Sequence, residues 1–344
     1  MSRLRHCDNH ENDGIAYITY SSNPHPAHQY MFRILKGERL HLWRRLAPLN
    51  ISFLLKPRHI VFSEGWRPSI YACFLKSLGL AKVHINILFG DFMKTLINKP
   101  VLKDVAGILY RQWVDVAIAN SSLTYELARK ILGLDKEKLF ICWPVSLKIN
   151  IFKNVKPKVD SDILSVCYLG YITLNDGADL LPTIYSMLKR EEENTKMYVI
   201  GGPLGKELTL YKKLLRFSRN ESSFRVLGPL PDEQVKEVFT RCTFFVYPAR
   251  FKAFGLPVVE AMSAGLVPLI TRNVGARDFV TLLSSKLIVD PPEKMVKTIL
   301  EIYTRGRDYI RELSHRGKRI ALGYDEKNAK KRFMRILKTI LSRR

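Results

Sequence analysis

The chain has 344 residues, 47% of them hydrophobic, and its 56 lysines and arginines exceed its 32 acids to give a net charge of +24. A single core usually stops growing near ~250–300 residues, so we expect two domains. The sequence has no apolar run of the ~18–20 residues that span a bilayer and no signal-peptide pattern at its start, so we expect a cytoplasmic protein. The charge predicts an anionic partner, and nucleic acid, an anionic membrane surface and phosphorylated small molecules all qualify.

Apolar runs alternate with helical patterns in the first half, which indicates parallel sheets with crossover helices. Helical patterns cover 68–80 and 122–134, and the second opens with serines and closes at Gly133. The lysine-rich, proline-containing segment 154–162 breaks the pattern, and we place the interdomain linker there. The candidate strands are 14–20, 59–65, 82–90, 114–122 and 139–145.

The second half repeats the alternation more regularly. We therefore predict domains over 1–153 and 160–324, followed by a closing helix over 325–344. Helical patterns cover 177–193, 206–220 and 231–242. The candidate strands are 163–170, 196–202, 223–228, 243–249 and 286–290.

The stretch "FKAFGLPVVEAMSAGLVPLI", residues 251–270, predicts a loop, a short helix and a buried strand. Pro257 suits the first helical position and Gly265 the stop, which places Glu260 in the first turn. There Glu260 either complements the helix dipole or contacts a ligand. The loop before the helix contains Gly255, whose missing Cβ lets an anion or a ribose-phosphate approach closely.

A second glycine turn, Gly201-Gly202-Pro203, follows a predicted strand and precedes a helix. By itself it is a weak signal, since such a turn is often only a turn. It matches neither the dinucleotide fingerprint nor a Walker P-loop, which disfavours those nucleotide-binding classes. The five cysteines are scattered and predict no metal site.

The C-terminal segment "NAKKRFMRILKTILSRR" is basic and amphipathic. One side carries apolar residues, including Phe333 and Ile336, at helical spacing. We favour a helix docked on the protein over a helix that lies on an anionic membrane.

Four second-half segments together resemble the donor domain of retaining glycosyltransferases with the GT-B fold, the glycosyl transferases group 1 or mannosyltransferase-like family. The resemblance covers about residues 160–300, whereas the first half matches loosely. It implies an α/β fold of GT-B type, with two Rossmann-like domains facing across a cleft. The segments are "SVCYLGYITLNDGADLLPTIYSML", "MYVIGGPLGKE", "FRVLGPLPDEQVKEVFTRCTFFVYPA" and "AFGLPVVEAMSAGLVPLI".

The resemblance also implies a donor site. Glu260 would hold the ribose hydroxyls of a nucleotide-sugar, and Leu230 would lie beside the base. The backbone of the loop before Glu260 would contact the phosphates or the sugar, and two glycine turns would line the pocket. These remaining positions are Gly170, Tyr171, Gly201, Gly202, Pro203, Phe254, Gly255 and Leu256.

Several family positions differ in this chain. Lys252 stands where the family has the first of two glutamates, and Tyr171 and Asp176 stand where it has the arginine and lysine that neutralise the diphosphate. Phe89 replaces a histidine of the acceptor domain. Lys252 is either a substitute cation for the phosphates or a solvated loop lysine.

The predicted function is transfer of a sugar from a nucleotide-sugar, a substrate and not a cofactor, to an acceptor hydroxyl. The acceptor is unknown and could be a glycan, a lipid-linked molecule or a protein. We expect a metal-independent reaction, because backbone N–H groups, a helix N-terminus and nearby cations can stabilise the leaving diphosphate, and we place Lys252 and Glu260 in the catalytic centre. Glu64 and Asp91 follow predicted strands and are either acceptor-side acids or ordinary loop acids.

Two alternatives to this function stay open. A degenerate GT-B protein would bind nucleotide-sugar or glycan without turnover, as the missing arginine, lysine and first glutamate suggest. A nucleic-acid-binding protein would explain the charge, but the sequence has no recognised binding motif. A peripheral contact with an anionic membrane is compatible with either GT-B alternative.

Overall fold

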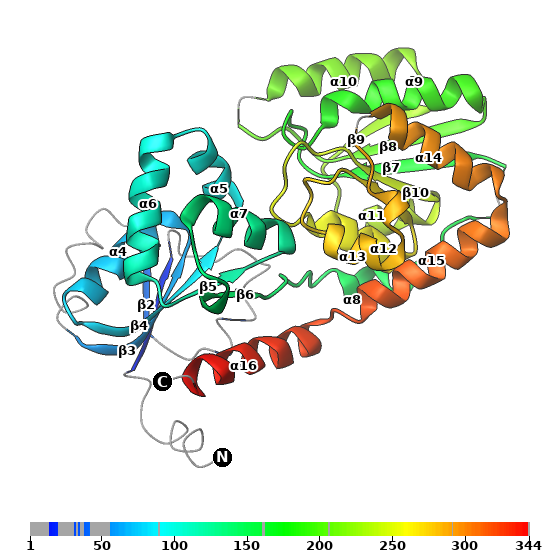
Figure 1. Ribbon diagram of the computed structural model, residues 1–344. Helices are drawn as coiled ribbons and strands as arrows, with labels where there is room; N and C mark the ends of the chain where they lie inside the picture. The colour runs from blue at the N-terminus through cyan, green and yellow to red at the C-terminus, as the bar shows by residue number, and fades with distance from the viewer. Residues whose placement is uncertain are drawn as a thin grey trace. The chain divides into compact units, whose positions relative to one another are not determined.

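The computed structural model describes residues 14–19, 31, 34, 38–41, 56–88, 90–159, 162–205, 207–290 and 292–342 (Figure 1). The chain forms two compact units, residues 1–145 with 326–344, and residues 146–325. The division therefore falls at Ser146, ahead of the lysine-rich segment where the sequence places the linker. The closing helix belongs to the first unit instead of following the second.

The first unit contains a parallel sheet in the order β2-β1-β3-β4-β5-β6. The five strands predicted from apolar runs are confirmed, whereas β2, α5 and α6 were not predicted. The strands are β1 (Ile15–Thr19), β2 (Glu38–His41), β3 (Arg58–Glu64), β4 (Ala81–Leu88), β5 (Val116–Ala119) and β6 (Leu139–Ile141). The helices between them are α4 (Trp66–Ser77), α5 (Gly90–Ile97), α6 (Pro100–Trp113) and α7 (Ser122–Leu132).

Helix α7 shows how local sequence sets these boundaries. Ser121 precedes the helix in extended backbone, and its hydroxyl accepts a hydrogen bond from the Thr124 amide at 3.1 Å. Gly133 ends the helix in the left-handed region at φ 63°. The serine start and the glycine stop predicted from the sequence are confirmed.

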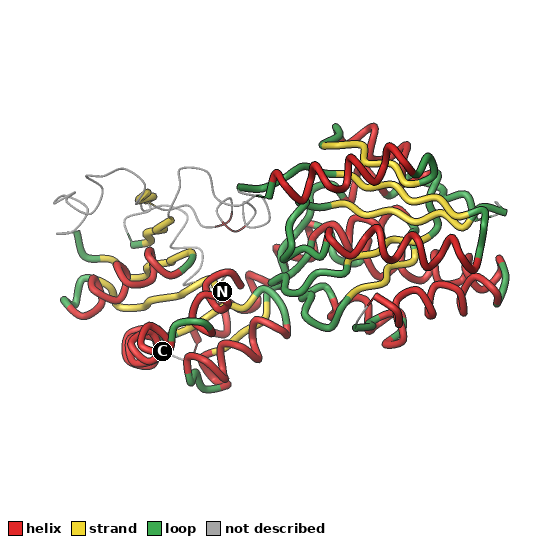
Figure 2. The backbone as a smooth tube through the Cα atoms, turned by 90° about the horizontal axis from the view of Figure 1, so that it is seen from above, coloured by secondary structure: helices red, strands yellow, loops and turns green. Residues whose placement is uncertain are grey.

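The second unit contains a five-stranded parallel sheet in the order β11-β10-β7-β8-β9. Figure 2 shows the strands of this sheet in yellow, with helices in red beside them. Helices α9 and α10 lie on one side of it, and α11 and α12 on the other (Figure 1). The strands are β7 (Leu164–Leu169), β8 (Thr195–Ile200), β9 (Phe224–Gly228), β10 (Phe244–Tyr247) and β11 (Val267–Ile270). The helices are α8 (Ile149–Phe152), α9 (Leu181–Glu191), α10 (Leu208–Asn220), α11 (Asp232–Thr240), α12 (Leu256–Ala264), α13 (Arg277–Leu283), α14 (Pro292–Thr304) and α15 (Arg307–Leu322).

The strand predicted over 286–290 is wrong. Its first part belongs to a 3₁₀ turn, Ser285–Leu287. Ile288 then forms a single β-bridge with Ile270 of β11 and no continuous ladder. The run is apolar because Leu287 is buried, so apolar character here reflects core packing and not strand pairing.

The strand order of the second unit creates a topological switch point between β7 and β10. From β7 the chain adds β8 and β9 on one side, and then returns to add β10 and β11 on the other. The loops that leave β7 and β10 therefore diverge to opposite faces of the sheet. Open parallel sheets bind ligands in the crevice that this divergence leaves at the carboxyl ends of the strands.

Helix α16 (Glu326–Ser342) packs into the core of the first unit. Its apolar face contains Phe333, which is fully buried and lies 6.5 Å from the Phe62 ring between centroids. Ile336 and Ile340 are buried in the same cluster. The preferred prediction of a docked helix is confirmed, because the face that a membrane would need already fills the core.

Other predicted features concern cysteines and membrane spans. Cys73, Cys142, Cys167 and Cys242 are buried, as expected for small apolar residues, and Cys7 lies outside the described residues. Within the described part of the chain, no helix has both the length and the apolar character needed to cross a bilayer.

A buried polar network crosses the first unit beneath α4 and α6. The Ser63 hydroxyl lies 2.7 Å from His84 Nε2, and His84 Nδ1 lies 3.1 Å from the carbonyl of Trp113. The Asn86 amide donates to the Ser63 hydroxyl at 2.8 Å and accepts from Tyr110 at 3.2 Å. A neutral imidazole satisfies these contacts, and burial lowers the pKa of His84 to about 4.

The His84 shift predicts acid lability of the first unit. As the pH falls below about 6.5, His84 of the unfolded chain takes up a proton, whereas His84 of the folded chain stays neutral until about pH 4. The folded state therefore loses stability as the pH falls from about 6.5 to about 4. At 1.36 kcal/mol per unit the full effect is at most about 3 kcal/mol. Thermal unfolding between pH 7 and pH 5 should show a shallower pH slope for His84→Gln than for the parent. His59→Gln, at an exposed position, is the control and should keep the parent slope.

Phe333→Ala should destabilise the first unit by about 3–5 kcal/mol, because it opens a cavity in the core that α16 completes. Leu341→Ala, on the same helix but at a side chain that is 40% exposed, should change stability little. Chemical denaturation of both variants provides the measurement. Equal stability of the two would mean that α16 does not depend on its buried face.

Candidate functional site

The loops that leave β7 and β10 are joined across the switch point. The Arg250 amide donates to the Asn175 carbonyl at 2.8 Å, and the Asn175 side chain donates to the Phe251 carbonyl at 2.7 Å. Gly177 has φ 74°, and a Cβ there would lie 2.1 Å from the Pro248 carbonyl oxygen. Residue 177 must therefore be glycine for the two loops to pack.

An ion pair lies at the centre of these joined loops. Lys252 Nζ lies 2.7 Å from Asp176 Oδ1, which also accepts from the Tyr247 hydroxyl at 2.8 Å. Thr173 donates to the other carboxylate oxygen at 2.7 Å. The Asp176 side chain is 4% exposed and that of Lys252 is 32% exposed, so the acid is enclosed while the ammonium still reaches the surface. Lys252 Nζ also lies 5.8 Å from the centroid of the Tyr171 ring.

Lys252 is therefore not a solvated loop lysine, because its ammonium contacts a buried carboxylate. The two contacting positions are those where the family resemblance implies the opposite charges, a glutamate at 252 and a lysine at 176. Relative to what the resemblance implies, the charges at these two positions have exchanged signs, and we call Lys252 and Asp176 the exchanged pair. An ammonium that already neutralises Asp176 adds less positive charge to a phosphate site than the two cations it was expected to replace.

Glu260 lies in the second turn of α12, not the first as predicted. Helix α12 begins at Leu256, one residue earlier than expected, because Gly255 serves as its N-cap at φ 94° and Pro257 takes the second position. Ser146 donates to Glu260 Oε1 at 2.5 Å, and the glutamate is 6% exposed. Burial raises the pKa of Glu260, partly offset by the Ser146 hydroxyl and by the positive charge of Lys148.

The turn at Gly170 and the turn at Gly201-Gly202-Pro203 lie against one another. Gly201 has φ 137°, and a Cβ there would lie 1.8 Å from the carbonyl oxygen of Gly170. The Ile172 amide donates to the Gly202 carbonyl at 2.8 Å, and Ile172 forms a bridge with Pro203. The structure therefore brings together Gly170 and the 201–203 turn, which the sequence placed in one pocket.

The loop before α12 can contact a ligand through its backbone amides, because its large side chain is buried. Phe254 is buried with its ring edge-on to Phe279 at 5.6 Å, and its carbonyl accepts from the Ala276 amide at 2.6 Å. Leu256 opens the helix, so the amides that follow Gly255 are those of a helix N-terminus. Leu230 is half-buried after β9, at the same edge of the sheet.

The predicted acceptor-side acids belong to the first unit. Glu64 is the last residue of β3 and is buried, and Asp91 is the second residue of α5, directly after β4. Strands β3 and β4 are neighbours, so both positions lie at the carboxyl edge of one sheet. Phe89 and the side chain of Asp91 lie outside the described residues.

Three partners of the site residues were not predicted: Ser146, Thr173 and Tyr247. Ser146 is 114 residues from Glu260, and no local pattern connects them. The contact between Lys252 and Asp176 could have been predicted. The resemblance implies a glutamate at 252 and a lysine at 176, and two replacements of opposite charge indicate that the new residues could neutralise each other. Within the described residues, no group of three or more metal-ligating side chains is found.

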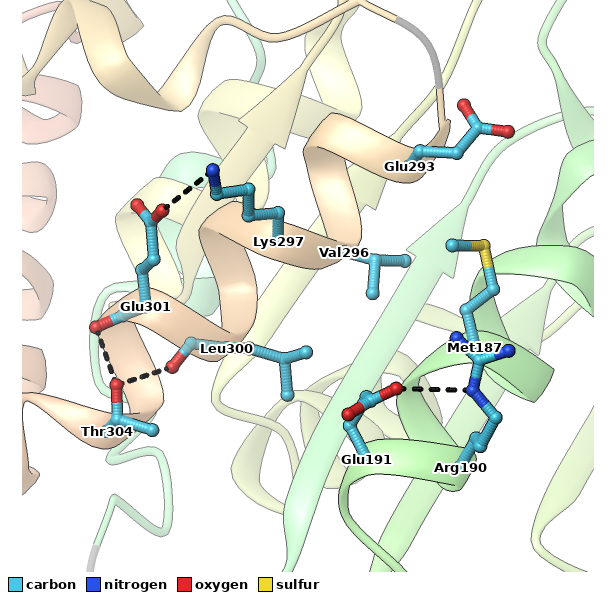
Figure 3. A pocket seen from close by; sticks show the side chains of 9 residues that line it. All are labelled: Met187, Arg190, Glu191, Glu293, Val296, Lys297, Leu300, Glu301 and Thr304. Carbon is cyan, nitrogen blue, oxygen red and sulfur yellow. Dashed lines mark hydrogen bonds and ion pairs between the residues drawn. The ribbon is translucent and has the colours of Figure 1, made fainter.

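A hollow of about 380 Å³ between α9 and α14 lies away from these loops (Figure 3). Its lining includes the neighbouring charges Arg190 and Glu191 at the end of α9 that leads into β8, the amino edge of the sheet. A second hollow, of about 250 Å³, is lined by Ala249 and Thr271 beside the carboxyl ends of β10 and β11. The second hollow is the one adjacent to the joined loops.

Charge reversal tests the ion pair. Lys252→Glu should destabilise the second unit by about 3–5 kcal/mol, because it places a second carboxylate against buried Asp176. Adding Asp176→Lys should recover much of that loss, since the pair is restored with its charges exchanged. Chemical denaturation of the parent, both single variants and the double variant measures the coupling. Additive single effects would contradict a direct pair, and Arg250→Glu, at an exposed pair with Asp179, is the milder control.

The comparisons with known proteins concern the second unit most directly. The family model "Glycosyl transferases group 1" matches residues 150–320. The chain is 26% identical over 211 residues to a phosphatidylinositol N-acetylglucosaminyltransferase subunit of Arabidopsis thaliana, covering 61% of this chain and 45% of the relative. It is 32% identical over 107 residues to "O-antigen chain mannosyltransferase B" of Escherichia coli, covering 31% and 28%. The chain thus spans less than half the length of each of these relatives.

The fold resembles solved structures over nearly the whole chain. Anabaena HepE in complex with UDP superposes with a TM-score of 0.78 at 14% identity, covering 95% of this chain and 100% of that one. The HepE complex with UDP-glucose gives a TM-score of 0.70 at 14% identity, covering 95% and 99%. The two parallel sheets predicted from the sequence are confirmed as the GT-B type of α/β fold.

Proposed function

We propose, from the match of residues 150–320 to the glycosyl transferases group 1 model, that the chain is a retaining glycosyltransferase that uses a UDP-sugar. The sugar would pass to an acceptor hydroxyl that stays unidentified. The observation that carries the proposal is the glycine-lined switch point beside the N-terminus of α12 and buried Glu260. The UDP complexes of HepE favour uridine as the base of the donor.

The geometry supports a donor held mainly by backbone groups. The amides at the start of α12 form a partial positive charge where a diphosphate would lie, and Gly255 leaves room for its approach. Glu260 would accept hydrogen bonds from the ribose hydroxyls through its carboxylate, which Ser146 holds in one orientation. The Gly170 and Gly201 turns would form the wall of this pocket, with Leu230 beside the base.

Leaving-group stabilisation would come from preorganised dipoles. As the bond between the anomeric carbon and the diphosphate breaks, negative charge grows on the phosphate oxygens that the α12 amides face. The acceptor oxygen would attack the same face of the sugar, and its proton must go to a base. Glu64 and Asp91 remain our candidates for that base, and this assignment rests on their place at the strand ends of the first unit.

Glu260→Gln tests the donor site. Glutamine keeps the size of the buried side chain but not the charge, so UDP affinity should fall about tenfold while thermal stability changes little. Calorimetric titration with UDP, GDP and ADP measures both affinity and base preference. Glu233→Gln, an exposed position on α11, is the control and should bind as the parent does. Unchanged UDP affinity of Glu260→Gln would contradict the ribose role, and tighter GDP or ADP binding would contradict uridine.

A turnover assay distinguishes an active glycosyltransferase from a protein that binds the nucleotide-sugar without reaction. Incubation with radiolabelled UDP-sugars should show transfer, or slow hydrolysis when no acceptor is supplied. The second candidate is a degenerate binder, which the exchanged Lys252–Asp176 pair favours because the family cations are missing. UDP binding without hydrolysis or transfer from any donor would establish that candidate instead.

A further inference from the structure

Helices α4 and α6 of the first unit each expose an apolar stripe. The first stripe consists of Ile70 and Phe74 on α4 and Leu78 directly after it, with exposed fractions of 44%, 51% and 55%. Their spacing of four residues puts them on one side of the helix, and Cys73 and Leu75 are buried in the core. The stripe therefore faces outward along the whole helix.

The stripe on α6 consists of Val101, Val105 and Ile108, with exposed fractions of 79%, 48% and 56%. Their helical spacing again defines one face, opposite to buried Ala106 and Tyr110. Surface residues of this size are ordinary when scattered, but a contiguous group marks an interaction surface.

The two stripes belong to neighbouring helices. Both helices connect adjacent parallel strands in the same direction, β3 to β4 and β4 to β5, and right-handed crossovers place them on the same side of the sheet. Cys73 Sγ of α4 lies 4.0 Å from the Leu109 carbonyl of α6, one residue from Phe74 and from Ile108. The exposed side chains therefore make one patch, which we call the α4–α6 patch.

Basic residues dominate the chain around the α4–α6 patch. Segment 66–113 has seven lysines and arginines against two aspartates. Lys99 is exposed just before α6. Lys103 lies within the α6 stripe in sequence, and its Nζ is 3.9 Å from Oδ1 of the exposed Asp104. An apolar face with basic residues around it matches a bilayer with anionic headgroups, where the side chains enter the acyl boundary and the lysines meet the phosphates.

We propose that the α4–α6 patch docks the protein on an anionic lipid bilayer. Charge decides between a bilayer and a second copy of the chain, because self-association would bring two basic surfaces together. An anionic membrane would instead be attracted to them. Helix α16 does not serve this purpose, because its apolar face is buried.

Vesicle sedimentation tests the proposal without depending on enzymatic activity. The full chain should bind vesicles of phosphatidylcholine with phosphatidylglycerol more tightly than phosphatidylcholine alone, and more weakly at high salt. Phe74→Ser with Val101→Ser should lower the partition coefficient about tenfold or more, because both side chains enter the acyl boundary. Leu282→Ser with Leu341→Ser is the matched control, at exposed leucines outside the patch, and should bind as the parent does.

A charge variant and two physical measurements complete the test. Lys99→Glu with Lys103→Glu should weaken binding to anionic vesicles and remove much of its salt dependence. Melting curves should be similar for all variants, since the changed side chains lie at the surface. Parent-like vesicle binding by the Phe74/Val101 variant, or absence of binding by the parent, would overturn the proposal. So would sedimentation velocity showing a parent dimer that the Phe74/Val101 variant dissociates.

Discussion

The contact between Lys252 and Asp176 determines how the two loops at the switch point can be arranged. A buried carboxylate is costly unless it is paired and hydrogen-bonded, and here an ammonium and two hydroxyls meet its two oxygens. The loop after β7 supplies Asp176 and Thr173, whereas β10 and its loop supply Tyr247 and Lys252. Because loops on diverging sides of the sheet share one charge, neither can move without exposing it. Shape at this edge of the sheet therefore follows from electrostatics as much as from apolar packing.

The exchanged pair changes how this site could hold a diphosphate. A lysine at 176 facing a glutamate at 252 and an aspartate at 176 facing a lysine at 252 have the same net charge, but the cation moves from one loop to the other. With Tyr171 in place of an arginine as well, fixed positive charge near the phosphates would come mainly from the amides at the start of α12. The net charge of +24 attracts anionic donors from a distance, but it does not orient them.

Sequence patterns predicted the buried strands well, but they predicted helix starts and long-range side-chain contacts poorly. Alternating apolar runs identified the strands of both sheets except β2, because a buried parallel strand is apolar, whereas β2 has the polar sequence Glu38–His41. Residues 286–290 failed because their apolar side chains serve the core without a strand ladder. Glu260 was misplaced by one turn because Pro257 is equally compatible with the second helical position once Gly255 takes the cap. Its partner Ser146 was beyond prediction from local sequence, since that hydrogen bond depends on the tertiary fold.

Helix α16 and the α4–α6 patch show why amphipathicity alone does not identify a membrane surface. Both have apolar side chains with basic residues near them in sequence, and α16 is the more strongly amphipathic of the two. The difference is where the apolar side chains go. Phe333 and Ile336 are buried in a core, and moving them out would leave a cavity. Phe74 and Val101 are exposed to solvent, so burying them in a membrane breaks no packing contact in the core. A surface that gains by burial, rather than one already buried, is the one able to bind a partner.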